Sequence, residues 1–269
     1  MMEDAAGLLE HVLAEKHARV EEAGDGGAAV PASTRAHVFG MSMGGMIAQL
    51  LAIHYPERVL SLNLMMTHVG GKHMIHPSLL TYTHLLRAPA KSKEQYADNM
   101  IAFIDFLSVG SYRTASSDDE AAAGEDGPDA AAGPRPTPQQ RADAMREELR
   151  LYILKGCERD GFRVAVDRQA AAVVRAPSRL TQLQALNADC YPPAPRAHTA
   201  GARRHIPTLV LHGHKDPLIP VANALRLASA INGARLVLYP QLGHDFPPPL
   251  YQSLAKEILL NMSKAPEMK

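Results

Sequence analysis

Ser42, Asp216 and His244 are residue types that work together in nucleophilic catalysis, and each stands in a distinctive local sequence. Ser42 is the centre of Gly-Met-Ser-Met-Gly, where a short apolar run ends and a helical pattern begins. A serine on such a strand-to-helix turn has its hydroxyl clear of the backbone. Gly40 and Gly44, two residues to either side, would remove side chains that collide in the bend. Serine alone is a poor nucleophile, so it needs a base and a group that orients the base.

The sequence assigns a role in acyl transfer to each of four residues. Ser42 would attack an acyl carbonyl, and His244 would accept its proton and later pass it to the leaving group. Asp216 would fix the tautomer of the histidine, and the backbone amide of Met43 would donate a hydrogen bond to the oxyanion. Two simpler assignments stay open. Asp216 could only cap the helix that follows it, and Asp245 is a rival acid, although its place beside the histidine in sequence suits it poorly to reach that ring.

A metal site is a competing interpretation, because imidazoles are common metal ligands and three histidines are available in His212, His214 and His244. His212 and His214 are two residues apart at the end of a predicted strand, so their side chains start on the same face. The two cysteines of the chain are not spaced as a metal-binding pair, and an activated serine makes a metal unnecessary. We therefore favour serine chemistry over a metal site.

Composition and charge are those of an ordinary soluble chain. Of 269 residues, 46% are hydrophobic and 21% are charged. Lysine plus arginine and aspartate plus glutamate number 28 each, so bulk charge favours neither nucleic acid nor an anionic membrane surface. No apolar run approaches the roughly 20 residues that a membrane helix needs, and the first residues lack a signal-peptide pattern. Two cysteines are too few for a disulfide framework, which favours a reducing, cytoplasmic location.

Four short apolar runs are predicted strands: His37–Gly40, Val59–Met66, Thr208–His212 and Arg235–Tyr239. Apolar periodicity predicts helices at Asp4–Val20, from Gly44 to about His54, at Val221–Ile231 and at Pro249–Met262. Strands that alternate with helices indicate an α/β fold with a parallel sheet of about four strands. Asp216 and His244 each follow a strand, so both belong at the carboxyl-terminal edge of the sheet, where sites in such folds lie.

The middle of the chain has another pattern and divides the sequence into three parts. Residues 1–68 and 205–269 carry the α/β pattern, whereas residues 69–204 contain helices and loops without a convincing strand. Helices are predicted there at Pro77–Leu86, Lys93–Leu107, Pro138–Gly156, Val166–Arg175 and Arg179–Ala188, the third with Tyr152 facing inward. Residues 114–138 have almost nothing to bury, so we expect a disordered insertion. The block is predicted to be a helical cap, inserted after the second strand and lying over the strand ends.

At these residues the chain resembles the α/β-hydrolase superfamily, and within it the capped serine esterases that include aclacinomycin methylesterase. The segments that carry the resemblance follow in order: G-M-S-M-G-G-M-I-A-Q, A-I-H-Y-P-E-R-V-L-S-L, P-T-L-V-L-H-G-H-K-D-P-L-I-P-V and G-H-D-F-P. Ser42, Asp216 and His244 also stand in the chain order of that superfamily. The resemblance covers Asp4–Gly71 and Arg175 to the end, and it is weak in the cap.

The resemblance implies hydrolysis of a small-molecule carboxylic ester through an acyl-enzyme, without a cofactor. A serine at position 42 argues against epoxide hydrolases and haloalkane dehalogenases, which carry an aspartate there. Serine perhydrolases, also called haloperoxidases, share the triad, so they remain an alternative.

Members of the superfamily have several strands before the helix that matches Asp4–Val20, and a loop among those strands supplies the second oxyanion amide. This chain starts at that helix and has no H-G-x-P or H-G-G-G sequence before Ser42. We therefore expect a partial α/β-hydrolase fold that lacks N-terminal strands and exposes a sheet edge. The alternative to an active esterase is a catalytically impaired remnant that binds a ligand or a partner, or self-associates through that edge.

Overall fold

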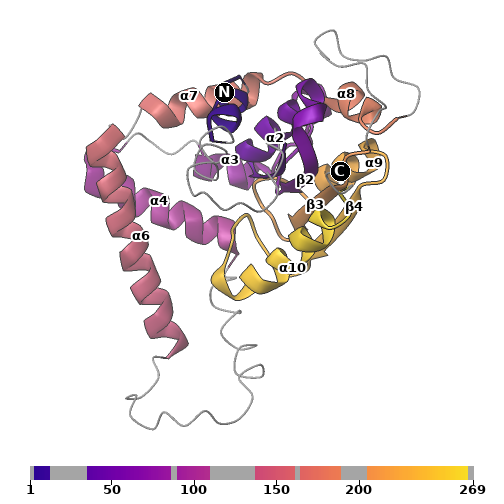
Figure 1. The fold of residues 1–269 in the computed structure, drawn as a ribbon. Coiled ribbons are helices and arrows are strands. Elements are labelled where there is room, and N and C mark those ends of the chain that lie inside the picture. Colours follow the sequence, from indigo (N-terminus) through magenta and orange to yellow (C-terminus); the bar gives the residue numbers. More distant parts are fainter. Residues whose placement is uncertain are drawn as a thin grey trace, which may run out of the picture.

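The computed structural model describes residues 3–12, 35–85, 90–109, 137–160, 164–188 and 205–265, and Figure 1 shows how their elements are arranged. Most of the predicted insertion at residues 114–138 lies outside these ranges. The second half of the helix predicted at Asp4–Val20 also lies outside them, and the described part is helical over residues 3–12.

Within these ranges, four parallel strands form one sheet in the order β1-β2-β3-β4: Ala36–Met41, Val59–Met65, Thr208–Gly213 and Arg235–Tyr239. The predicted α/β class and the parallel sheet of about four strands are confirmed. Every residue of β3 is buried, as expected of a parallel strand that has helices over both faces. Because the strands are parallel, the turns after all four of them lie along the same edge of the sheet.

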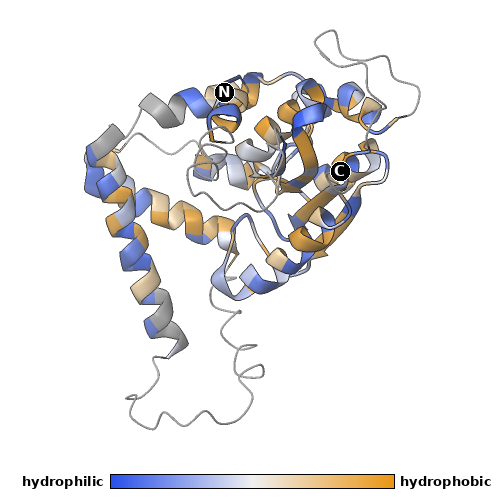
Figure 2. Cartoon of the chain, in the orientation of Figure 1, coloured by the Kyte–Doolittle hydropathy of each residue, from blue (hydrophilic) through white to orange (hydrophobic). Residues whose placement is uncertain are grey.

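Helices cover both faces of the sheet (Figure 1). On one face lie α2 (Met43–His54), α8 (Leu180–Ala185) and α9 (Ala222–Ala230), whose apolar residues share a buried cluster with the strands. On the other face lies α10 (Tyr251–Met262), which follows a short 3₁₀ turn at Pro248–Leu250. Figure 2 shows apolar residues concentrated in the strands and in the helix sides that face them.

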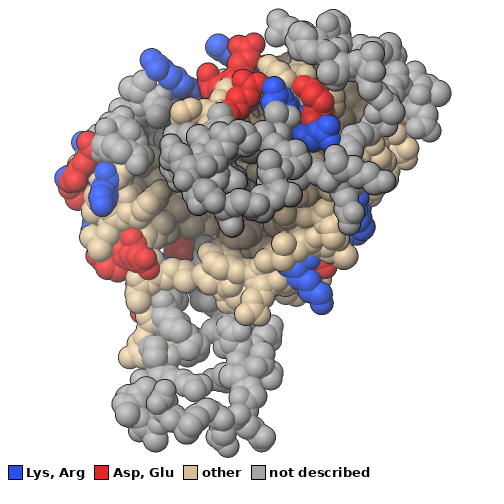
Figure 3. Space-filling view, in the orientation of Figure 1, with Lys and Arg blue, Asp and Glu red and all other residues tan. Residues whose placement is uncertain are grey.

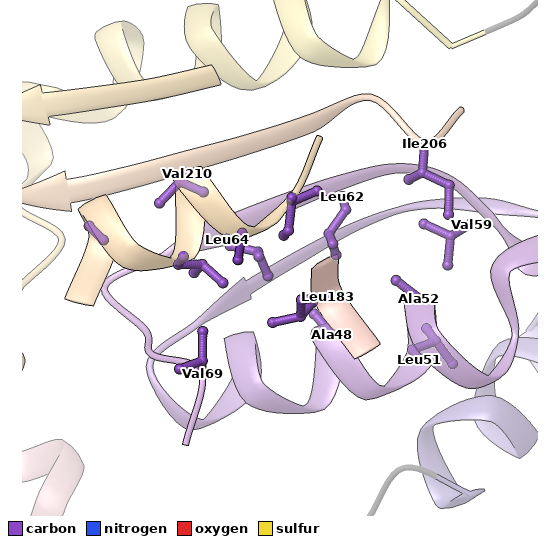
Figure 4. Close-up of a cluster of buried hydrophobic side chains, with 14 residues drawn as sticks. Ala48, Leu51, Ala52, Val59, Leu62, Leu64, Val69, Leu183, Ile206 and Val210 are labelled. Atoms are coloured by element: carbon purple, nitrogen blue, oxygen red, sulfur yellow. The ribbon is translucent and has the colours of Figure 1, made fainter. Parts of the chain in front are cut away.

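The alternation of β2 explains how one strand serves both layers. Leu62 and Leu64 point into the first cluster, where they meet Leu183 of α8 (Figure 4). Met65 points to the opposite face and packs with Leu254 of α10. All five side chains are fully buried, and each such burial contributes about 1.5–3 kcal/mol to the stability of the fold.

Between β2 and β3, the described residues form helices and irregular segments and no strand. The helices that come before α8 are α3 (Leu79–Leu85), α4 (Lys93–Ser108), α6 (Pro138–Asp160) and α7 (Val164–Arg175). The helices predicted in this block are present where the structure describes it, and the role of the block as a cap stays a prediction. None of the described helices is both long and apolar enough to cross a membrane.

α6 packs against α4, in part through exposed ion pairs, and one prediction about it is wrong. Arg146 lies 3.0 Å from Asp105, and Arg150 lies 3.2 Å from Asp98. Tyr152, which was expected to face inward, is 74% exposed. Among the described elements, α6 packs mainly on α4, so too few elements surround the helix to bury Tyr152. Charges of both signs are interspersed on the face that Figure 3 shows, in keeping with a net charge of zero.

Candidate active site

Ser42 occupies the turn between β1 and α2 in a backbone conformation that residues other than glycine rarely adopt. Its φ is 52° and its ψ is −119°, and a positive φ at a residue other than glycine costs roughly 1–3 kcal/mol. The turn is held by the neighbouring strand, because the Ser42 amide donates to the carbonyl of Met65 at 2.9 Å. The structure therefore has the strained strand-to-helix turn that the sequence predicts.

The glycines around Ser42 confirm half of the steric argument. A Cβ on Gly40 would lie 2.3 Å from the carbonyl oxygen of Gly44, so no side chain fits there. A Cβ on Gly44 would have nothing within 4 Å, so the prediction that this glycine also prevents a collision is wrong. The second crowded position is Gly45, where a Cβ would lie 2.7 Å from the Thr67 side chain. This glycine lets α2 lie close to the loop that follows β2.

Met43 is the first residue of α2. The amides of the first helical turn have no carbonyl partner inside the helix, and the helix dipole adds partial positive charge there. These properties suit an oxyanion donor, and the role assigned to the Met43 amide stays a prediction.

Asp216 and His244 are brought together from the ends of β3 and β4. The Nδ1 atom of His244 lies 2.7 Å from Oδ2 of Asp216, and both side chains are almost fully buried. The other carboxylate oxygen accepts hydrogen bonds from the amides of Leu218 at 2.9 Å and Ile219 at 2.8 Å. Since an ionised carboxylate only accepts, Nδ1 carries the proton, and Nε2 of His244 is left as a base.

The loops after β3 and β4 are locked together by their backbones. The amide of Lys215 donates to the carbonyl of Leu242 at 3.0 Å. A Cβ on Gly213 would lie 2.3 Å from two carbonyl oxygens of the facing loop, those of Leu242 and Gly243. This close approach fixes the separation of the two loops that carry the carboxylate and the imidazole.

The end of α4 holds the histidine loop from the other side. The amide of His244 donates to the carbonyl of Leu107 at 2.8 Å, and a Cβ on Gly243 would lie 2.1 Å from that same carbonyl oxygen. α3 makes a similar contact with the other loop, because Thr81 Oγ1 donates to the carbonyl of Pro217 at 2.8 Å. Sequence reasoning missed both contacts. The glycine before His244 was the available signal for a close approach, but nothing indicated which segment approaches.

His212 supports the Asp216 turn and does not pair with His214. It is fully buried, and its Nε2 lies 2.8 Å from the carbonyl of Ile219 and 3.5 Å from Oδ2 of Asp216. Burial lowers the pKa of His212, and the nearby Asp216 carboxylate only partly opposes this. His214 lies just beyond the end of β3 and is exposed. The two side chains that were expected to start on one face therefore lie in different surroundings.

Ser42 is on the same sheet edge as the other two residues, and an aromatic contact joins its strand to the histidine loop. The ring of Phe39, three residues before Ser42, lies 6.4 Å from the ring of Phe246, two residues after His244. Among the hydrogen bonds of the described residues, none joins the Ser42 hydroxyl to His244. The structure thus joins Asp216 directly to His244 and sets Ser42 on its own turn at this edge.

Comparisons with known proteins agree with this architecture. Residues 33–118 match a family described as alpha/beta hydrolase fold, and residues 182–257 match a family described as TAP-like protein. The enol-lactonase from Burkholderia xenovorans LB400 superposes with a TM-score of 0.53 at 15% identity, over 86% of this chain and 67% of that chain. A bacterial membrane phospholipase A superposes with a TM-score of 0.50 at 19% identity, over 94% of this chain and 64% of that chain.

The meta-cleavage product hydrolase from Pseudomonas fluorescens IP01 has a TM-score of 0.45 at 15% identity, over 86% of this chain and 64% of that chain. This chain thus spans 64–67% of the length of these three proteins. At such identities, the two structures with TM-scores of 0.53 and 0.50 bear on the fold alone. The first match contains β1 and β2 and extends into the helical block through α3 and α4, and the second begins within α8 and contains β3, α9 and β4. The chain belongs to the α/β-hydrolase superfamily.

Proposed function

We propose that this chain is a serine hydrolase that cleaves a small carboxylic ester through an acyl-enzyme. The observation that carries the proposal is the buried contact of 2.7 Å between His244 Nδ1 and Asp216 Oδ2, at the same sheet edge as the strained turn of Ser42. A histidine with Nδ1 held by a carboxylate offers Nε2 as a base, which is what a serine hydroxyl needs.

The proposed reaction has two halves. In the first, the hydroxyl oxygen of Ser42 attacks the ester carbonyl, and its proton passes to Nε2 of His244. The tetrahedral intermediate collapses as His244 returns that proton to the leaving alcohol, which leaves an acyl-serine ester. In the second half, His244 takes a proton from water, the hydroxide attacks the acyl group, and the carboxylic acid leaves as the proton returns to Ser42. The amide of Met43 stabilises the negative oxygen in both halves.

Esterase turnover and active-site labelling test the proposal together. The purified chain is expected to hydrolyse p-nitrophenyl butyrate and to react with a fluorophosphonate at Ser42, which peptide mass spectrometry identifies. Ser42→Ala is expected to lose both signals. Ser229→Ala is the matched control, because Ser229 is an exposed serine of α9 that bonds only within its own helix.

Each outcome decides for or against the proposal. Turnover that survives in Ser42→Ala, or labelling that maps to another residue, would contradict it. A folded chain with neither turnover nor labelling would favour a catalytically inactive binding protein. Labelling of Ser42 together with bromination of monochlorodimedone in bromide, peroxide and acetate would show that the same serine also has perhydrolase activity.

A further inference from the structure

A second feature that could hold a ligand lies apart from Ser42, Asp216 and His244. In the described part of the chain, a cavity of about 770 Å³ opens between the segment after β2, α3 and the end of α7. None of the three proposed catalytic residues lines it. Its volume is within the range of roughly 300–1,000 Å³ that is usual for small-molecule sites.

The charged side chains among the described lining residues of this cavity are all positive. Lys72 lines it from the segment after β2 and Arg175 from the end of α7, and no aspartate or glutamate is among its described lining residues. Both cations are exposed, and neither forms an ion pair within the described ranges. By contrast, the exposed cations Lys93 and Arg146 each lie 3.0 Å from a carboxylate. Two cations without a carboxylate favour a negatively charged ligand.

The rest of the wall is largely apolar. Met74 and Val173 are partly buried there, and Val174 is 79% exposed at the same cavity. An exposed valine beside two cations suits a ligand with a hydrocarbon part and a charged end. His76 and Tyr82 add a polar pair, with 2.8 Å between Nδ1 of the imidazole and the phenol oxygen.

Two walls of the cavity, the segment after β2 and the segment after α7, are joined to each other by hydrogen bonds. His73 Nδ1 lies 2.6 Å from the hydroxyl of Ser178, which ties the segment after β2 to the segment after α7. The amide of Arg179 donates to the carbonyl of Val69 at 2.8 Å and strengthens the same junction. A Cβ on Gly71 would lie 2.5 Å from the amide nitrogen of Ser178, which shows how closely the two backbones approach.

We propose that this cavity binds a free amphipathic carboxylate, with the carboxylate between Lys72 and Arg175 and the hydrocarbon chain against Met74 and Val173. This binding site is separate from the proposed hydrolase site, so it requires no catalysis by Ser42. Attraction between the carboxylate and the two cations provides the preference for an anion, and burial of the ligand's hydrocarbon chain provides the affinity.

Calorimetric titration with three ligands of the same chain length tests the proposal. Octanoate is expected to bind saturably with one site per chain, and octan-1-ol and octylammonium are expected to bind more weakly. Lys72→Gln with Arg175→Gln should weaken octanoate binding by about tenfold, from the usual size of two exposed charge pairs. Higher salt should weaken it further, because both cations are exposed.

Two further variants separate a site from general charge. Lys256→Gln with Lys264→Gln removes two exposed cations of the α10 region, away from the cavity lining, and should leave octanoate binding unchanged. Val174→Asp keeps both cations but adds a negative charge at an exposed lining residue, and it should weaken octanoate binding. Absence of saturable binding, equal affinity for the three ligands, or equal effects of the two double variants would overturn the proposal.

Discussion

Oδ2 of Asp216 and Nδ1 of His244 lie 2.7 Å apart, in a buried contact between two loops that are 28 residues apart in sequence. The carboxylate is in turn held by two backbone amides of its own turn. A carboxylate with hydrogen bonds on both oxygens can hold the imidazole in one orientation and one tautomer. A histidine that activates serine as a base requires this.

Asp216→Asn should lower kcat for p-nitrophenyl butyrate by about 10⁴, on the proposal that Ser42 and His244 catalyse ester cleavage. The amide that replaces the carboxylate can still accept from the turn, but its NH₂ group would face Nδ1 and favour the wrong tautomer. Asp98→Asn is the matched control, since that exposed carboxylate only pairs with Arg150. A loss of less than tenfold in folded Asp216→Asn would contradict the assigned role.

The three glycines near Ser42 should respond differently to alanine. Gly40→Ala should prevent stable folding, because its Cβ would lie 2.3 Å from a backbone oxygen that cannot move aside. Gly45→Ala should cost about 1–3 kcal/mol through overpacking against Thr67. Gly44→Ala has open space in a helix and should be neutral or stabilise by up to about 1 kcal/mol. Urea unfolding measures all three, and a Gly44→Ala chain as unstable as Gly40→Ala would contradict this account.

The sheet and the Asp216–His244 pair could be predicted from sequence because their signals are local. Each strand is a continuous apolar run, and each predicted strand end lies within one residue of the end in the structure. Both polar residues follow such runs, so topology alone sets them on one edge. The Leu107 carbonyl that holds His244 could not be predicted, since a backbone acceptor has no side-chain signature. The openness at Gly44 was missed for a similar reason, because it depends on which segments pack nearby.

The burial of Arg179 could not be predicted from the sequence, and it leads to a prediction about stability. It is 2% exposed, and burial lowers its pKa to about 10, so it remains charged at neutral pH. Its donors bond to Gln49 Oε1 at 3.0 Å and to the carbonyl of His68 at 2.9 Å. No carboxylate pairs with it within the described ranges. Neutral acceptors alone therefore hold this cation at the junction of α2, α8 and the loop after β2.

Arg179→Met should lower the free energy of unfolding by about 3 kcal/mol, because it leaves buried acceptors without their charged donor. Urea unfolding followed by circular dichroism measures the change. Arg175→Met is the matched control, since that arginine is exposed and should change stability by less than about 0.5 kcal/mol. Equal unfolding midpoints for the two variants would show that the buried contacts contribute nothing.

His68 lies beside this cation and should make the fold sensitive to acid. Its pKa is lowered from 6.5 to about 4, first by burial and then by the charges of Arg179 and His76. Its Nδ1 accepts from the amide of Gly70 at 3.0 Å, so the neutral ring is the form that fits. Burial lowers the pKa of His212 as well, so its effect on stability has the same sign.

The contribution of His68 to the free energy of unfolding should therefore be complete above about pH 6.5 and fall as the pH drops toward about 4. In that window the unfolded chain binds a proton at His68 and the folded chain does not. Between about pH 7.5 and about pH 5, this histidine alone should lower the free energy of unfolding by roughly 2 kcal/mol. His68→Asn keeps an acceptor for the Gly70 amide but cannot titrate, so its free energy of unfolding, measured in urea, should depend less on pH by that amount. His54→Gln should retain the dependence of the unchanged chain. If His68→Asn and the unchanged chain lose stability equally on acidification, the sensitivity belongs to other groups and the buried neutral state of His68 is wrong.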